Sequence, residues 1–152
     1  MAAPTTLRYG AGVLYIGDGA SPEVFTKVCG FNSSEITIDK STSSTTVPDC
    51  DDVDEAAWEE KDVSSKSWSM SFSGVAAVEA LPLLEAATLS GTSRNIRLDL
   101  AGAGTGAGTT TRRYAGAAHV KSSLTGQRGE RWSVKVDVEG DGALTISSVA
   151  AA

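Results

Sequence analysis

The sequence lacks the long hydrophobic run that a membrane-spanning helix requires. No stretch of about 18 apolar residues occurs in the 152-residue chain, and this excludes a transmembrane helix. The first ten residues lack a basic segment followed by an apolar one, so we expect no secretory signal and an origin in a cytoplasm. A chain of this length suits one domain, here residues 1–152, with a substantial core.

Residues that commonly carry catalysis or bind metals are also scarce. The single histidine, His119, has no evident acid partner in the sequence, and no serine lies in a Gly-x-Ser-x-Gly motif, so nucleophilic catalysis has no support. Cys29, Cys50 and His119 lack the paired spacing that is typical of a zinc site. We therefore expect no enzyme, no metal and no cofactor, and a small enzyme is the weakest alternative.

The two cysteines are too few for a disulfide framework. A bond between Cys29 and Cys50 would close a loop of about 21 residues and add roughly 3 kcal/mol in an oxidising medium. A cytoplasmic origin argues against that bond. The alternative is a buried Cys29 and a Cys50 in a loop.

Negative charge is concentrated in one segment. Residues 49–62 hold eight carboxylates and one lysine, a balance of −7, whereas the whole chain carries −6. A calcium loop starting at Asp49 would need an oxygen ligand and a glycine at the positions of Val53 and Asp54, so that motif fails. A solvated loop and an arm that docks on a basic surface remain. The acidic residues are Asp49, Asp51, Asp52, Asp54, Glu55, Glu59, Glu60 and Asp62.

Positive charge gathers in the second half of the chain. Residues 94–135 hold eight basic and two acidic residues, a balance of +6. Opposite charges on identical copies favour head-to-tail association into rings or filaments. We therefore expect the acidic segment to be an intersubunit arm with a basic docking surface. The candidate docking residues are Arg94, Arg97, Arg112, Arg113, Arg128 and Arg131.

Alternating apolar and polar residues predict a mainly β, or α+β, domain. The clearest strand places Trp68, Met70 and Phe72 on one face and serines on the other. A strand over 34–41 is expected to turn Ile36 and Ile38 inward. Other strands are predicted over 7–16, 24–29, 95–100, 112–124, 131–140 and 144–146. The predicted core includes Trp68, Met70, Phe72, Leu81, Leu84, Trp132, Val134 and Val136.

The remaining segments predict one helix and three irregular regions. Apolar residues at three- to four-residue spacing indicate a helix over 76–89, with Pro82 near its first turn. Residues 40–62 lack periodicity and predict a long loop, and 147–152 a flexible tail. Residues 102–107 fit a loose Gly-x-Gly-x-x-Ala pattern, but a strand follows instead of the helix that a dinucleotide site needs. We expect a mobile hairpin tip there.

Three stretches carry a resemblance to a known family. VFTKVCGFNSSEITIDKS (24–41), WEEKDVSSKSWSMSFSG (58–74) and the strand–turn–strand region 112–145 resemble the major tail tube proteins of long-tailed, non-contractile bacteriophages or phage-like particles. The resemblance implies a β-sandwich or barrel with one flanking helix. It also implies six copies per ring, strands joined into an inner barrel, and a long loop that reaches neighbouring copies.

The resemblance further implies partners and a location. Rings of this chain would stack around a tape measure protein, meet tail-end proteins, and let DNA pass through the lumen without specific binding. The protein would reside in the virion tail, assemble in the bacterial host cytoplasm and contact no membrane. A net negative lumen would let the duplex slide, because it repels phosphates. The alternative is a monomeric β-sandwich binding or adhesion module, which would not self-assemble.

Overall fold

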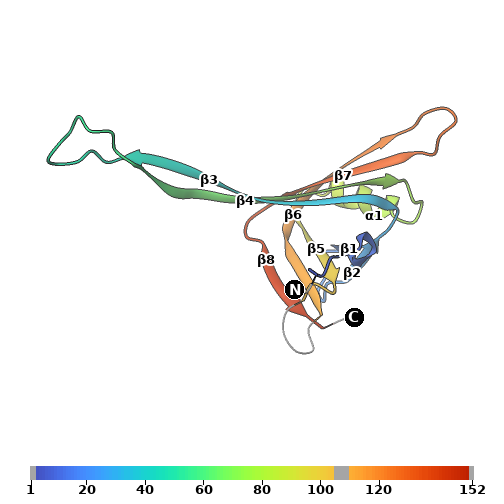
Figure 1. Ribbon diagram of the computed structural model, residues 1–152. Helices are drawn as coiled ribbons and strands as arrows, with labels where there is room; N and C mark the ends of the chain where they lie inside the picture. The colour runs from blue at the N-terminus through green and yellow to red at the C-terminus, as the bar shows by residue number, and fades with distance from the viewer. Residues whose placement is uncertain (1–2, 105–109, 151–152) are drawn as a thin grey trace.

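Strands make up most of this chain. The computed structural model describes residues 3–104 and 110–150, which contain eight strands, one α-helix and one short 3-10 helix (Figure 1). The predicted mainly β fold with one helix is confirmed. The elements are η1 (Tyr9–Ala11), β1 (Gly12–Gly17), β2 (Phe25–Val28), β3 (Phe31–Thr46), β4 (Glu59–Val75), α1 (Leu81–Leu89), β5 (Arg94–Ala101), β6 (Thr111–Thr125), β7 (Ser133–Gly140) and β8 (Thr145–Val149).

All eight strands belong to one antiparallel sheet in the order β2-β1-β5-β6-β7-β4-β3, and β8 also pairs with β6. The long strand β6 pairs with β5 along its first half and with β7 along its second half. The sheet therefore folds over at β6, with β3, β4 and β7 on one side and β1, β2 and β5 on the other (Figure 1). A single open sheet thus produces the predicted sandwich-like form.

The core lies between these two parts of the sheet. Phe72, Ile16, Ile96 and Val136 are at most 1% exposed, and they come from β4, β1, β5 and β7. The Phe72 ring packs against Phe31 with a centroid distance of 5.4 Å. Of the predicted core residues, Trp68, Met70, Phe72, Leu84, Val134 and Val136 are buried and Leu81 is half-buried.

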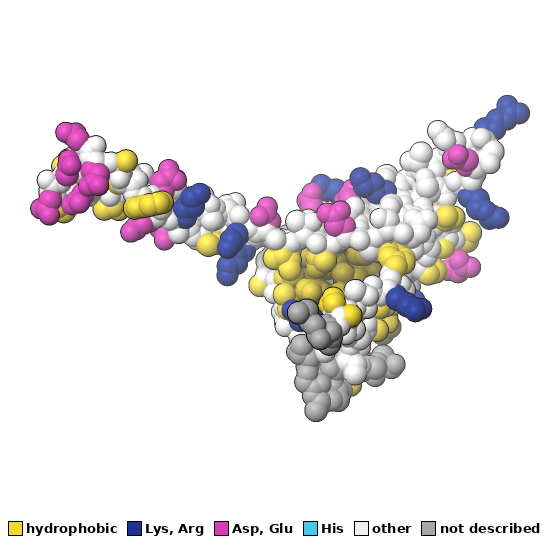
Figure 2. All heavy atoms as spheres, viewed as in Figure 1, with side chains coloured by type: hydrophobic (Ala, Val, Ile, Leu, Met, Phe, Trp, Pro, Cys, Tyr) yellow, Lys and Arg dark blue, Asp and Glu magenta, His cyan; other side chains and the backbone are white. Residues whose placement is uncertain are grey.

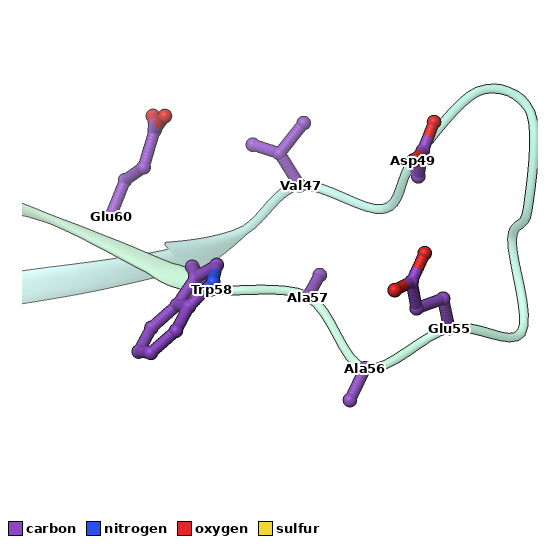
Figure 3. A pocket seen from close by; sticks show the side chains of 7 residues that line it. All are labelled: Val47, Asp49, Glu55, Ala56, Ala57, Trp58 and Glu60. Atoms are coloured by element: carbon purple, nitrogen blue, oxygen red, sulfur yellow. The ribbon is translucent and has the colours of Figure 1, made fainter.

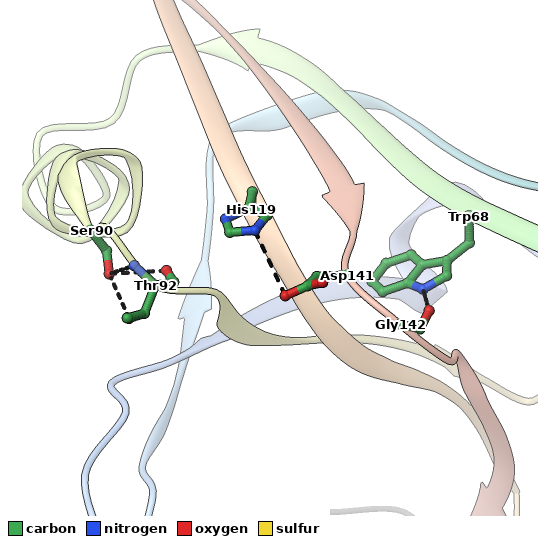
Figure 4. A network of polar contacts seen from close by, with 6 residues as sticks. All are labelled: Trp68, Ser90, Thr92, His119, Asp141 and Gly142. Atoms are coloured by element: carbon green, nitrogen blue, oxygen red, sulfur yellow. Dashed lines mark hydrogen bonds and ion pairs between the residues drawn. The ribbon is translucent and has the colours of Figure 1, made fainter.

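Trp68 fills a slot that two glycines leave open. A Cβ at Gly116 on β6 would lie 2.7 Å from the indole ring, and a Cβ at Gly140 on β7 would also collide with it. The indole Nε1 donates a hydrogen bond to the carbonyl oxygen of Gly142 at 3.1 Å (Figure 4). Gly142 lies between β7 and β8, which follow one another along the same edge of β6. Trp68 therefore stabilises the place where one strand ends and the next begins.

The helix is shorter than predicted and begins at Leu81. The Ala76 amide donates to the carbonyl oxygen of Trp132 at 2.9 Å, and residues 77–80 form a turn, so the helix cannot begin earlier. Pro82 lies in the first turn, where its missing N–H leaves no helical bond unmade. The helix buries Leu84 and packs on β6, where Thr88 Oγ1 lies 3.0 Å from Ser122 Oγ.

Two side chains that the alternation places inward are exposed. Trp132 is 61% exposed and Ile38 is 55% exposed, so their predicted core positions are wrong. Both lie on the core side of the sheet by register, Ile38 opposite Trp68 and Trp132 just before β7. Periodicity fixes which face a side chain occupies, but it does not show where the covering layer ends.

The predicted loop over 40–62 is mostly a β-hairpin. Strands β3 and β4 pair out to Thr46↔Glu59, with a register shift between Ser41 and Thr42, so the loop proper spans only 47–58. Both faces of the hairpin are exposed there, and strands solvated on two faces show no apolar alternation. The predicted tail over 147–152 is also too long, since Ser147 and Val149 lie in β8 and pair with β6. The predicted mobile tip at 102–107 falls partly on residues 105–109, outside the described residues.

Candidate functional site

The β3–β4 hairpin projects far beyond the core, and we call residues 41–65 the arm and residues 47–58 the arm tip (Figure 1). Five of the predicted acidic residues lie on the arm tip and three on β4 within the arm, all exposed. Asp49 and Asp52 accept hydrogen bonds from the amides of Asp51 and Asp54, which shapes the loop locally. The tip group is Asp49, Asp51, Asp52, Asp54 and Glu55; the β4 group is Glu59, Glu60 and Asp62.

The arm tip also carries large apolar side chains. Trp58 is 92% exposed, Val53 70% and Val47 56%. A hollow of about 390 Å³ lies inside the loop, with Glu55 pointing across it toward Asp49 and the Trp58 indole projecting to the other side (Figure 3). We did not predict Trp58 as a contact residue, although a tryptophan inside an acidic segment without periodicity could have indicated one. The arm tip is thus both acidic and apolar.

The predicted basic docking surface separates into two groups. Arg94, Arg97, Arg112 and Arg113 lie on β5 and β6 and have partners within the chain. The Arg113 guanidinium makes two hydrogen bonds to the Asp99 carboxylate, at 3.0 and 3.2 Å. Arg97 lies between the rings of Tyr15 and Phe25, 4.7 and 4.5 Å from their centroids.

The other two arginines of this group also have partners inside the chain. Arg94 donates to the carbonyl oxygen of Gly17, and Arg112 to the Tyr114 hydroxyl. In contrast, Arg128 and Arg131 lie exposed in the turn that connects β6 and β7, at the end of the sheet opposite the arm tip. Only these two of the six arginines therefore combine an exposed side chain with a position on a projecting turn.

A broad polar surface lies on the outer side of the sheet formed by β6, β7, β4 and β3. The serines that alternate with Trp68, Met70 and Phe72 lie on the other face of β4. They pair across the strands with charged residues such as Asp137, Glu139 and Glu35. No element within 3–104 or 110–150 packs over this surface, which Figure 2 shows from the side as the charged upper edge. We call it the polar face. Its charged members are Glu35, Asp39, Lys121, Lys135, Asp137 and Glu139.

Ion pairs organise the polar face. Lys121 Nζ lies 2.8 Å from the Glu139 carboxylate, whose hydrogen bond raises the pKa of Lys121 above its ordinary value. The lysine therefore stays charged at neutral pH. His119 Nε2 lies 3.7 Å from the Asp141 carboxylate (Figure 4). Four carboxylates and two lysines leave the face with a balance of −2, so it is weakly acidic.

The cysteines cannot form the disulfide considered above. Cys29 and Cys50 are free and exposed, and the 16 residues of β3 separate them by about 50 Å at 3.3 Å per residue. A disulfide needs Cα atoms within about 7 Å. The alternative of a buried Cys29 is also wrong, whereas Cys50 does lie in the loop of the arm tip.

In the described part of the chain, no three His, Cys, Asp or Glu side chains converge on a point that would hold a metal ion. Within the same residues, no helix has the length and apolar character needed to cross a membrane.

Solved structures of tail components share this fold. A chain from the tail of an empty gene transfer agent (GTA) particle, with C6 symmetry, has a TM-score of 0.72 at 15% identity, covering 93% of this chain and 99% of that chain. A chain from a native GTA virion has a TM-score of 0.67 at 13% identity, with the same coverage. A chain from the SPP1 tail tube has a TM-score of 0.63 at 8% identity, covering 96% of this chain and 81% of that chain.

Comparison with sequence families identifies the chain. No curated protein sequence matches it significantly. The family model described as phage tail tube protein, however, matches residues 11–146, which is most of the chain. The chain therefore belongs to the phage tail tube protein family and is a structural protein that forms the tube of a phage or phage-like tail.

Proposed function

We propose that six copies of this chain form a ring, and that the rings stack into a tube whose lumen is lined by the polar face. The observation that carries this proposal is the two-sided sheet of β6, β7, β4 and β3. One side is buried on α1 and on the other part of the sheet, whereas the other side is polar and uncovered along four strands. The C6 symmetry of the GTA tail with the same fold supports the number six.

The polar face suits a conduit for DNA. Its weak negative balance repels phosphates, while the short serine side chains offer no clustered cations that would hold a duplex. We propose that DNA passes along this face without sequence-specific contacts. A tape measure protein would occupy the lumen before the DNA, and tail-end proteins would close the stack. Assembly would take place in the cytoplasm of the bacterial host.

The arm would join copies, because it buries almost nothing within its own chain. The projecting part of β3, residues 41–46, has both faces exposed, so its side chains gain packing only from a neighbouring copy. The carboxylates of the arm tip repel one another in an isolated copy, and a basic neighbour would relieve that repulsion. The arm therefore supplies contacts between copies, and the edge strands supply pairing between neighbours in a ring.

Electron microscopy of the purified chain tests this function. We expect rings or hollow tubes at rising protein concentration, and we expect high salt to loosen them, because exposed charge pairs are screened at about 10 Å in 0.1 M salt. Tubes that do not loosen at high salt would still support the proposed function, but they would exclude an electrostatic role for the arm. A chain that stays monomeric under every condition would contradict self-assembly and favour the binding-module alternative.

Reversing the charge of the polar face should make assembled tubes bind duplex DNA instead of letting it pass. The double variant Asp137→Lys and Glu139→Lys changes the face from −2 to +2 per copy, so we expect assembled tubes to retain duplex DNA at low salt. Tubes of the unaltered chain should release it. Co-sedimentation of tubes with labelled DNA measures the difference.

The matched control places the same charge change elsewhere. Glu79 and Glu85 are exposed beside and on α1, away from the polar face. Tubes of the Glu79→Lys and Glu85→Lys variant should retain no more lumenal DNA than the unaltered chain, measured after nuclease has removed DNA bound outside. Equal retention by the two double variants would show that the polar face does not line the lumen.

A further inference from the structure

Exposed apolar side chains gather at the two opposite ends of one layer of the sheet. Along β4, the register runs from Glu59 at the arm to Val75 at the far end, where Val75 pairs with Ser133 of β7. Thr125 of β6 also pairs with Ser133, so the β6–β7 turn emerges at that far end. We call residues 124–132 the hairpin end. The arm tip and the hairpin end therefore point in opposite directions along the strands (Figure 1).

The arm tip presents Trp58 as an anchor that no residue of 3–104 or 110–150 covers. An exposure of 92% leaves nearly the whole indole in water, and indole rings bury about 150–250 Å² when they find a partner. Val47 and Val53 add apolar surface beside five carboxylates, and residues 47–58 contain no cation. A partner for this surface must be apolar at its centre and basic around it.

The hairpin end has those properties. Trp132 is 61% exposed, and Leu124, which lies on the same face of the sheet, is 47% exposed. The Trp132 ring lies directly against Gly126, where a Cβ would approach ring atoms to 2.7 Å. The ring is therefore held in place before any partner arrives, which lowers the entropy that binding loses. Arg128 and Arg131 supply the exposed positive charge of the hairpin end, against the single acid Glu130.

The two surfaces cannot meet within one chain, because the whole length of the sheet separates them. They meet when a second copy is shifted along the strand direction, since the arm tip of one copy then reaches the hairpin end of the next. Tryptophan and arginine are the residues most enriched among interface hot spots, and an arginine over an indole adds a cation–π contact. Figure 2 shows the acidic and apolar tip at one end and basic side chains at the other.

We propose that Trp58 of one copy docks on Trp132 of a copy in the adjacent ring, with Arg128 and Arg131 facing the carboxylates of the arm tip. This contact rests on the proposed stacking of rings, and it assigns the contact between adjacent rings to two tryptophans. The contact is heterologous, so each ring would offer arm tips on one side and hairpin ends on the other.

A cross-linking experiment tests the contact with both tryptophans in place. Cys50 already lies on the arm tip, so the variant Cys29→Ser with Gln127→Cys carries one thiol at each proposed partner surface. We expect a short bismaleimide to link Cys50 to the introduced thiol between copies in assembled tubes, giving a ladder on a denaturing gel. The control variant Cys29→Ser with Leu89→Cys places its thiol on α1, where Leu89 is 85% exposed, and should give no ladder.

A second pair of variants tests the tryptophans themselves. Trp58→Ala should lower the yield of tubes at fixed concentration roughly thirtyfold, the size typical of a hot-spot truncation, and should leave single rings intact. Leu89→Ala should assemble as the unaltered chain does. Tubes that link Cys50 to position 89 and not to position 127 would overturn the docking proposal while the tube function stands. A chain that never forms rings would overturn both.

Discussion

A chain whose arm tip is replaced by a two-residue Asn-Gly turn is expected to fold normally and to lose tube formation. Thr46 and Glu59 are directly paired, so a two-residue turn can join the strands without changing their register. The deleted residues 47–58 contain no buried side chain, and their removal should leave the free energy of unfolding nearly unchanged. Thermal unfolding and electron microscopy measure the two properties separately.

The expected loss concerns the contacts between copies. The deletion removes five carboxylates and the three exposed apolar side chains of the arm tip. The arm-tip half of the proposed contact between rings is therefore lost. We expect single rings at concentrations where the unaltered chain gives tubes. Leu89→Ala again serves as the neutral control. Normal tubes from the shortened chain would show that the arm tip plays no part in stacking.

The second large effect is expected at the centre of the core. Phe72→Ala should lower the free energy of unfolding by about 3–5 kcal/mol, the usual cost of truncating a buried phenylalanine. Phe72 is 1% exposed and packs against Phe31 across the β3–β4 pair, so the cavity would open in the core between the two parts of the sheet. Urea unfolding monitored by tryptophan fluorescence measures the change.

A control substitution on the same strand separates the effect of core burial from the effect of changing any residue of β4. Val75 lies three residues further along β4 and is 43% exposed, so Val75→Ala should cost well under 1 kcal/mol. A loss below about 1 kcal/mol for Phe72→Ala as well would mean that the two parts of the sheet do not share one core. Such a result would contradict the folded-over sheet described above.

The strands that border the core were predictable from the sequence, because one face of each strand is buried. Trp68, Met70 and Phe72 alternate with serines, and Val134 and Val136 repeat the pattern on β7. Alternation of this kind arises wherever a sheet has one buried and one solvated face. The same pattern assigned Trp132 and Ile38 to the correct face, but it could not show that the covering layer stops before them.

The arm was not predictable as a hairpin. Its strands are solvated on both faces, so burial left no periodic signal in the serines and threonines of residues 41–46. Their pairing with β4 continues from pairs that border the core, such as Ile36↔Met70, past a one-residue register shift between Ser41 and Thr42. A local sequence window does not contain that information.

The candidate docking surface was predicted only in part, because charge counting ignores partners inside the chain. The carboxylate of Asp99 holds Arg113, and the rings of Tyr15 and Phe25 hold Arg97. These contacts form between strands that are paired in the folded sheet or lie far apart in the sequence, so a count of charges does not include them. Only the arginines of the β6–β7 turn, Arg128 and Arg131, remain as candidates for a contact between copies.

A helical reconstruction of assembled tubes by cryo-electron microscopy tests the central claim most directly. We expect a hollow tube in which Glu35, Asp137 and Glu139 face the lumen and the arm tip of each copy lies on the hairpin end of a copy in the next ring. A tube with the polar face turned outward, or a solid filament without a lumen, would contradict it.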